Sequence, residues 1–296
     1  MDVSGLVPLE GGWSGHAYLA EVAGERSVVR LYPPAERSGT GAEVDAAVLR
    51  LVRGLVPVPE VLEVRPSSLA DDRPGVLVTS FVEGARGDQL LPTLAPDDRR
   101  RVGATLGGLA ADLGGMPMPR AGAFVDVDLR VRPWELDLPA YVEQQQPGLA
   151  HLSVEELDGL REVALEAQTL LDTVPRTCLV HSDLNPKNLL LDPGTLELTA
   201  VLDWEYAHAG HPFTDLGNLL RFDRDPDLTA AVLDAYCARR GGEPDAALEL
   251  ARAADLFALV ELTGRRASNP VAARADRLLR AIARARDAGT PEPGTS

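Results

Sequence analysis

The pattern of apolar and polar positions divides the chain into a strand-rich first part and a helical second part. Apolar residues recur at helical spacing within 43–53, which predicts a helix there. Runs typical of strands lie on either side of this helix, at residues 18–22, 27–31, 61–64 and 76–81. Helical spacing dominates the rest of the chain, at residues 94–113, 134–146, 153–173, 215–222, 226–239, 244–264 and 270–287. The pattern therefore predicts an α+β protein whose character changes from a strand-rich part at residues 1–84 to a helical part at 85–288, followed by a disordered tail at 289–296.

Polar side chains follow short strand-like runs in the middle of the chain. The apolar run at 179–180 predicts a buried strand, and Asp183 follows it within one loop. A second run begins at Asn188, and the turn signal at 192–194 joins it to a third run that ends at Asp203. One loop and two adjacent strand ends are therefore expected to bring these three side chains together.

This set of side chains suits phosphoryl transfer. The carboxylate of Asp183 can orient a substrate hydroxyl and accept its proton, while Asn188 and Asp203 offer oxygen ligands for Mg²⁺ on the phosphates. A lone Asp or Asn in a loop more often bonds its own backbone. The combination of H-x-D-x-x-x-x-N with a strand-ending aspartate fifteen residues after the asparagine favours the catalytic interpretation.

Composition restricts the class of protein further. The 296 residues carry a formal net charge of −16 at pH 7, which disfavours nucleic acid as a partner because its phosphates require a basic face. The same charge fits either a cationic small substrate, whose local concentration an acidic cleft raises, or solubility alone. The chain has no apolar run long enough for a membrane span and no signal-peptide pattern at its start. We therefore expect a cytoplasmic protein without a membrane partner, and no obligate protein partner is indicated.

Three segments of the sequence carry a resemblance to a known family. HSDLNPKN at 181–188, LDWE at 202–205 and HPFTDLGN at 211–218 resemble the aminoglycoside phosphotransferase family of small-molecule kinases. The resemblance extends from Leu6 to Ile282. It implies a bilobal, protein-kinase-like fold and transfer of the γ-phosphoryl group of ATP or GTP, with Mg²⁺, to a hydroxyl group of a small molecule.

The resemblance also implies nucleotide-binding roles in the first lobe. Arg30 occupies the position whose Lys or Arg contacts the α- and β-phosphates, and Glu43 is the helix acid expected to pair with it. Asp45 is an alternative partner, and acids also occur at helix N-termini for reasons of the helix dipole alone. The backbone carbonyl of Ser80 and the backbone N–H of Val82 are expected to meet the edge of the adenine ring.

Two other features each keep two interpretations. The glycines within 11–15 fit either a loop that covers the nucleotide or an ordinary hairpin. Asp215 begins a helix, where the family places an aspartate that braces the catalytic loop, and an N-cap role fits equally well. Because Asp215 follows Asp203 by only twelve residues, the chain has no room for the long activation loop of a protein kinase.

The resemblance places the acceptor between the catalytic loop and the C-terminal helices. Acidic side chains that could hold its ammonium groups are Glu205, Asp223, Asp255 and Glu261. The preferred acceptor is a cationic antibiotic, either an aminoglycoside or a tuberactinomycin-type peptide, whose phosphorylation would confer resistance. Macrolides and choline-like, sugar-like or homoserine-type metabolites are the alternatives. A pseudokinase that binds without turnover is another, and its best argument is Arg30 in place of the commoner lysine.

Overall fold

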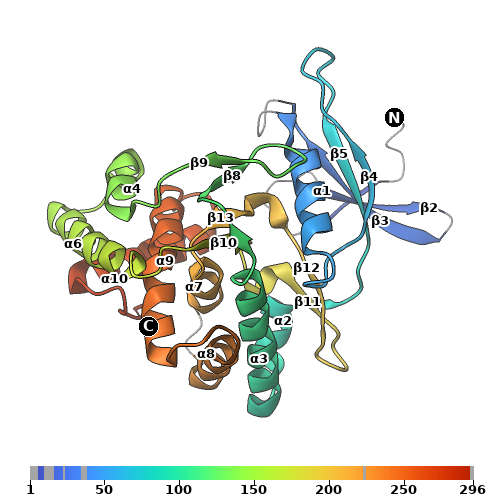
Figure 1. Cartoon of the computed structure of the whole chain (residues 1–296). Coiled ribbons are helices and arrows are strands. Elements are labelled where there is room, and N and C mark those ends of the chain that lie inside the picture. Colours follow the sequence, from blue (N-terminus) through green and yellow to red (C-terminus); the bar gives the residue numbers. More distant parts are fainter. Residues whose placement is uncertain (1–5, 10–16, 23, 35–38, 223–224, 294–296) are drawn as a thin grey trace. The chain divides into compact units, whose positions relative to one another are not determined.

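The structure is a computed structural model of the whole chain (Figure 1), and it describes residues 6–9, 17–22, 24–34, 39–222 and 225–293. Packing divides the chain into two compact units. The first, here called the sheet unit, comprises Met1–Leu94, Gly122–Pro133 and Asn185–His208. The second, the helical unit, comprises Ala95–Ala121, Trp134–Leu184 and Ala209–Ser296. The sheet unit thus includes two segments far beyond residue 84, and the expected lobe boundaries stay a prediction.

An antiparallel sheet forms the base of the sheet unit. Its strands lie in the order β1-β2-β3-β5-β4. They span Val7–Pro8 (β1), Ala17–Val22 (β2), Glu25–Tyr32 (β3), Val61–Arg65 (β4) and Gly75–Ser80 (β5). Strand β3 pairs with β2 on one side and β5 on the other, which places Arg30 opposite Ala17 and Leu77. The four strands expected in this region are confirmed.

Helix α1 (Gly41–Val52) packs against this sheet (Figure 1). Val44, Val48 and Val52 recur every four residues and are all buried, so an apolar stripe drives the packing. The helix begins close to the sheet, because a Cβ on Gly41 would lie 2.7 Å from the ring of Tyr32. The helix expected over 43–53 is confirmed, and it starts two residues earlier than the apolar pattern indicated.

A second, smaller sheet in the same unit fixes the two strand ends that carry candidate chemistry. Strands β6 (Ala85–Arg86), β11 (Leu189–Leu191) and β12 (Leu198–Val201) lie in the order β12-β11-β6. All residues of β11 are buried, which explains its continuous apolar run. The Val201 N–H donates to the carbonyl oxygen of Pro57 at 2.8 Å and ties this sheet to the segment before β4. The unit also contains α2 (Gly87–Leu90) and the hairpin of β8 (Gly122–Phe124) and β9 (Val131–Pro133).

The helical unit is built from helices that bury one another's apolar faces. The helices are α3 (Pro96–Leu113), α4 (Leu138–Gln144), α5 (Gln146–Leu149), α6 (Val154–Leu171), α7 (Thr214–Leu220), α8 (Pro226–Arg240), α9 (Pro244–Gly264) and α10 (Pro270–Ala285). Strand β7 (Pro117–Met118) pairs antiparallel with β10 (Thr177–Val180) in this unit. Within the described residues, no helix has both the length and the apolar character that crossing a membrane requires.

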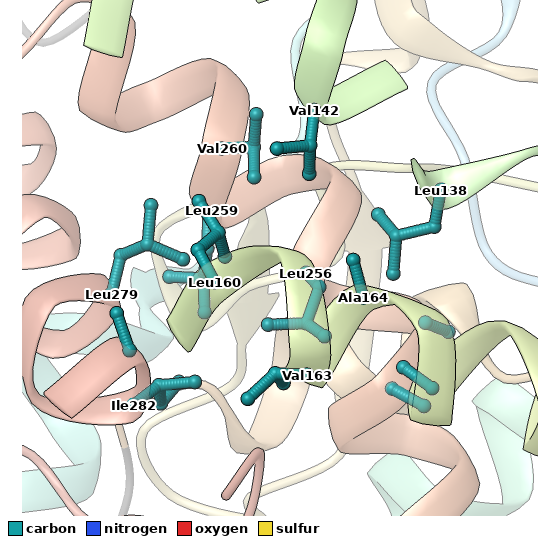
Figure 2. Packing of buried hydrophobic residues seen from close by; sticks show 14 of the residues in the cluster. Leu138, Val142, Leu160, Val163, Ala164, Leu256, Leu259, Val260, Leu279 and Ile282 are labelled. Atoms are coloured by element: carbon teal, nitrogen blue, oxygen red, sulfur yellow. The ribbon is translucent and has the colours of Figure 1, made fainter. Parts of the chain in front are cut away.

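One apolar cluster joins α4, α6, α9 and α10 (Figure 2). Leu160 of α6 is completely buried among Leu256 of α9 and Leu279 of α10, both also fully buried. Burying one such side chain stabilises the fold by about 1.5–3 kcal/mol. The cluster therefore holds α9 and α10 in place by packing. Helix α9 in turn packs against α7, which carries candidate site residues.

The first residues of α6 and α4 can be compared with the starts that the sequence predicted. The capping box expected at Ser153 is confirmed, because its side chain accepts the Glu156 N–H while the Glu156 carboxylate accepts the Ser153 N–H. The helix expected from Trp134 begins only at Leu138. Strand β9 occupies the residues just before it, and Asp137 starts the helix by accepting the Ala140 N–H at 2.8 Å. The apolar pattern also missed the short strands β7, β8 and β9.

Helices α3 and α8 approach each other closely at Gly107, where a Cβ would lie 2.1 Å from the carbonyl oxygen of Val232. We expect Gly107→Ala to lower the free energy of unfolding by about 1–3 kcal/mol, because a backbone atom cannot move aside easily. The helix propensity of alanine, about 1 kcal/mol better than glycine, does not offset this. Urea unfolding would measure the change.

Gly264→Ala is the matched control, because a Cβ there meets only the Cα of Gly148 at an ordinary 3.7 Å. This variant is expected to be as stable as the unsubstituted protein or slightly more stable. Equal stability of the two alanine variants would contradict the close approach of α3 and α8.

Candidate active site

In the helical unit, a buried carboxylate holds the backbone of the loop that carries Asp183. Strand β10 is buried and delivers His181, which is completely buried. The Asp215 carboxylate accepts the His181 N–H at 2.9 Å and the Ser182 N–H at 2.8 Å. Ser182 has a φ of 67°, a left-handed conformation that costs a non-glycine residue about 1 kcal/mol or more. The two hydrogen bonds stabilise this turn and so fix the position of the backbone from which Asp183 follows.

Asp215 is therefore a brace and not a helix cap. The N-cap of α7 is Phe213, with no side-chain capping hydrogen bond, and Asp215 lies in the first turn. Burial raises the pKa of the Asp215 carboxyl above its usual range, while His181 and the two N–H donors oppose that rise. Asp183 adds to the rise through its own charge. The bracing interpretation of Asp215 agrees with this geometry.

A second buried interaction lies beside the same helix. Arg221 at the end of α7 pairs with Asp255 of α9 through two nitrogens, Nε to Oδ2 at 2.8 Å and Nη2 to Oδ1 at 2.6 Å. Both side chains are about 95% buried, at 6% and 5% exposure. Asn218 adds a third contact, from Nδ2 to Oδ1 of Asp255 at 3.1 Å. Burial lowers the pKa of Arg221, but the charges of Asp255 and Asp183 outweigh it and the pKa is raised.

The acids expected to hold acceptor ammonium groups occupy different environments. The carboxylate of Asp255 is buried and taken by Arg221, so its geometry fits a structural role that locks α7 onto α9. Glu261 is half exposed and pairs with Arg265 one helical turn later, at 2.8 Å. Asp223 lies outside the described residues.

In the sheet unit, one guanidinium contacts two carboxylates. Arg30 of β3 donates from Nη1 to Oδ1 of Asp203 at 2.8 Å, and from Nη2 to Oε2 of Glu205. Asp203 has a φ of 65° and precedes the 3₁₀ turn η4 (Trp204–Tyr206). This tight turn allows acids two residues apart to reach the same guanidinium. Burial lowers the pKa of Arg30, but the combined effect of Tyr32 and the two carboxylates is larger. The pKa of Arg30 is therefore raised overall, and the side chain stays charged.

Asn188 lies next to Asp203 in the same unit. It ends the 3₁₀ turn η3 (Pro186–Asn188), and its carbonyl oxygen accepts the Leu202 N–H at 2.8 Å. Asn188 is 3% exposed. Within the sheet unit the structure therefore brings together Arg30, Asn188 and Asp203. The sequence predicted that Asp183 joins Asn188 and Asp203, and the position of its side chain relative to them stays a prediction. Asp183 precedes Asn188 by five residues on the same loop.

The oxygen donors of Asn188 and Asp203 fit Mg²⁺. This ion is typically held by one or two protein oxygens together with phosphates and waters. The described residues contain no group of three or more His, Cys, Asp or Glu side chains placed to hold a metal.

The partner of Arg30 corrects one expectation. Glu43 of α1 was expected to pair with Arg30, but the pairs seen for this guanidinium are to Asp203 and Glu205. Within the described residues, Oε2 of Glu43 is buried without a hydrogen-bond partner. Asp45, the other candidate on α1, accepts a hydrogen bond from the Tyr32 hydroxyl at 2.7 Å. Helix α1 is thus tied to β3 through Tyr32.

The segment after β5 is where the adenine edge was expected. Ser80 exchanges hydrogen bonds with Glu60, which anchors the end of β5: its N–H donates to the Glu60 carbonyl and its Oγ accepts the Glu60 N–H, both at 2.9 Å. Phe81 donates its N–H to the Arg26 carbonyl at 3.3 Å. The roles of the Ser80 carbonyl and the Val82 N–H stay predictions. The glycine-rich segment 11–15 lies outside the described residues.

Sequence reasoning missed three interactions of the site: Arg30 with Glu205, Tyr32 with Asp45, and Arg221 with Asp255. A signal existed for the last. Asp215, Asn218 and Arg221 recur every three residues in a helix that is otherwise mostly apolar. A polar stripe on a buried helix indicates paired polar groups, because unpaired ones are costly to bury. No comparable periodicity marks the other two pairs.

Comparisons with known proteins bear on the family and the fold of this chain. A family model described as the phosphotransferase enzyme family matches residues 5–253. The aminoglycoside 3'-phosphotransferase of Streptomyces fradiae is 28% identical over 198 residues, which are 63% of this chain and 67% of that protein. The GDP complex of wild-type aminoglycoside 2'-phosphotransferase-IIIa superimposes with a TM-score of 0.69 at 19% identity, covering 96% of this chain and 94% of the other. This likeness confirms the α+β, protein-kinase-like fold.

Another curated relative matches only in part. Acyl-CoA dehydrogenase family member 11 of Mus musculus is 31% identical over 120 residues, which are 34% of this chain. The match covers 15% of that protein's length. Relatives therefore include proteins much longer than this chain, of which the chain spans a small part.

Asp215→Asn tests the brace. The amide keeps one acceptor oxygen and presents an NH₂ group to the other backbone N–H, so one buried donor loses its partner, at a cost of about 1–3 kcal/mol. We expect faster amide exchange at Ser182 and a lower turnover number, measured by hydrogen exchange and by steady-state kinetics. Asp234→Asn, at an exposed position of α8, is the control and should change neither. Unchanged amide exchange and an unchanged turnover number in Asp215→Asn would show that Asp215 does not brace the loop before Asp183.

His211, at the entry to α7, predicts a pH dependence of stability. It is 6% exposed, and its ring bonds the Leu171 carbonyl at 3.3 Å. Burial lowers the pKa of His211 to about 4. The unfolded chain therefore takes up this proton first, so the stability is fully present above the ordinary pKa of 6.5 and is lost as the pH falls toward 4.

From about pH 7.5 to about pH 5 the loss from this one group is about 2 kcal/mol. Urea unfolding of His211→Asn should show a lower stability at neutral pH and a shallower decline toward acid than the unsubstituted protein. Parallel declines would show that His211 is not protected from protonation in the folded state.

Proposed function

The chain belongs to the phosphotransferase enzyme family, and we propose that it transfers the γ-phosphoryl group of ATP or GTP to a hydroxyl group of a small molecule. The observation that carries this proposal is the grouping of Arg30, Asn188 and Asp203 around the hydrogen bond from Leu202 to Asn188. Asp183 lies on the loop that ends at this group. Such an arrangement supplies a cation for phosphates, two oxygen ligands for a metal ion and a carboxylate for the acceptor.

Asp183 acts on the acceptor. Its carboxylate orients the attacking hydroxyl and accepts the proton as the new bond to phosphorus forms. The turn that precedes it is fixed by Asp215, so the carboxylate is positioned before the acceptor binds. Prepositioning matters because phosphoryl transfer depends mainly on geometry and charge neutralisation.

Arg30 and the two oxygen ligands act on the nucleotide. Asn188 and Asp203 would hold Mg²⁺, which when bound neutralises charge on the phosphates. The guanidinium of Arg30 is permanently charged and can donate a hydrogen bond to a phosphate oxygen. The Ser80 carbonyl and the Val82 N–H would meet the adenine edge, which rests on their positions after β5.

We propose a hydroxyl-bearing cation as the acceptor, with a cationic antibiotic as the first class to test and resistance as the resulting phenotype. The net charge of −16 and the aminoglycoside 3'-phosphotransferase relative support this choice. Of the four acids first considered for ammonium binding, Glu205, Asp255 and Glu261 each pair with an arginine, and Asp223 lies outside the described residues.

The test is release of ADP or GDP with Mg²⁺ across aminoglycosides, tuberactinomycin-type peptides, macrolides and small amino alcohols. The mass of the product would show whether the acceptor gains a phosphate. One acceptor with a phosphate adduct would support the proposal and identify the substrate class. Tight nucleotide binding without release for any acceptor would favour a pseudokinase that binds without turnover.

Asp183→Asn is the variant for this test. We expect turnover to fall by about a hundredfold or more, because the amide cannot accept the hydroxyl proton. Nucleotide affinity, measured by calorimetry, should be retained. Asp234→Asn serves again as the exposed control. Turnover in Asp183→Asn equal to that of the unsubstituted protein would exclude Asp183 as the base.

A further inference from the structure

The guanidinium of Arg30 is shared between two acids of one tight turn. Its side chain is 17% exposed, and those of Asp203 and Glu205 are 28% and 23% exposed. The two contacts use different nitrogens, Nη1 for Asp203 and Nη2 for Glu205. Arginine can therefore lose one partner and keep the other, which a single ammonium group cannot do as well.

The three charges sum to −1, so this group as a whole repels an anion. Phosphates that approach Arg30 meet two carboxylates within hydrogen-bond distance of the same guanidinium. A phosphate oxygen and Oδ1 of Asp203 would also compete for the same nitrogen. This conflict is relieved when a cation takes up the carboxylate of Asp203, since the charge there is then neutralised.

The ion pairs that the described residues show for Arg30 are to Asp203 and Glu205, in the turn after β12. Asp45 of helix α1 is engaged by the Tyr32 hydroxyl, and Oε2 of Glu43 has no hydrogen-bond partner within the described residues. The tie between helix and strand is made by Tyr32, whose ring centroid lies 5.6 Å from the guanidinium carbon of Arg30. The strand cation is thus positioned by the turn after β12.

We propose that Glu205 is the positioning residue that holds Arg30 for the phosphates, and that Asp203 is the partner that Arg30 exchanges for a phosphate oxygen. This inference deepens the proposed function and rests on it. Glu205 then takes the role that the sequence had assigned to Glu43. Glu205 follows Asp203 by two residues in LDWE, so metal binding and phosphate binding are coupled. When Asp203 binds the metal it releases Nη1 of Arg30, while Glu205 keeps Nη2 in place.

Calorimetric titration with ADP, in excess EDTA and in Mg²⁺, tests the exchange without requiring turnover. Asp203→Asn removes the competitor, so ADP affinity in EDTA should rise by about tenfold. Glu205→Ala removes the positioning acid, so ADP affinity should fall by about tenfold in both conditions. Glu205→Gln keeps an acceptor oxygen and should recover part of this loss. Simple charge repulsion predicts the opposite for Glu205, because losing a negative charge there would strengthen binding of an anion.

Kinetics supply a second readout. Glu205→Ala should raise the nucleotide KM and leave the acceptor KM unchanged, and its effect should exceed that of Glu43→Gln. Glu63→Gln, at an exposed position of β4, controls for the loss of any acid on this unit. Thermal unfolding would check each variant, and Glu205→Gln replaces Glu205→Ala if the latter does not fold.

The outcomes separate this inference from the function on which it rests. If the unsubstituted protein binds no nucleotide in Mg²⁺, the proposed function fails. If it binds nucleotide and transfers phosphate, but Asp203→Asn binds ADP no more tightly in EDTA, the exchange at Asp203 is overturned. Unchanged or tighter binding in Glu205→Ala would overturn the positioning role of Glu205.

Discussion

The ion pairs of Arg30 are the constraint on which the nucleotide side of the site depends. A strand residue and a turn far along the chain are held together by one partly buried guanidinium and two carboxylates. The turn exists because Asp203, two residues after the last residue of β12, adopts a left-handed conformation. The chain just before this turn is anchored, because the N–H groups of Val201 and Leu202 donate to the carbonyl oxygens of Pro57 and Asn188. Charge and backbone geometry thus specify the same arrangement.

In the helical unit, a left-handed turn is likewise held by a charged side chain, here a carboxylate that accepts backbone N–H groups. The loop of this unit before Asp183 also contains a left-handed residue, Ser182, and the buried Asp215 carboxylate accepts the N–H groups of Ser182 and of His181 before it. Helix α7, which supplies this aspartate, is fixed in turn by the buried pair of Arg221 and Asp255. Removing either member of such a pair leaves an uncompensated buried charge, which costs about 3–5 kcal/mol. Each unit thus holds its candidate residues in place with paired charges that are largely withdrawn from water.

The sequence predicted the elements well where periodicity was strong. The helices at 96–113, 154–171 and 244–264 and the four N-terminal strands follow directly from apolar spacing and capping residues. It also predicted that Asp183, Asn188 and Asp203 lie together. Asn188 and Asp203 do lie at the ends of neighbouring strands, whereas the place of Asp183 beside them stays a prediction. Short strands such as β8 and β9 were missed, since three residues carry too little periodicity. Partners of charged side chains were the least predictable, because Glu43 and Glu205 are equally acidic and only the turn after β12 decides which one reaches Arg30.

A structure of the protein with Mg²⁺ and a non-hydrolysable nucleoside triphosphate tests the account most directly. The account predicts a metal ion about 2.0–2.1 Å from oxygens of Asn188 and Asp203. It also predicts that Arg30 has moved one nitrogen from Asp203 to a phosphate oxygen while Glu205 keeps the other. A metal ion bound away from these two residues would contradict the assignment of the site. A nucleotide in place with Arg30 still paired to Asp203, or paired to Glu43, would contradict the role given to Glu205.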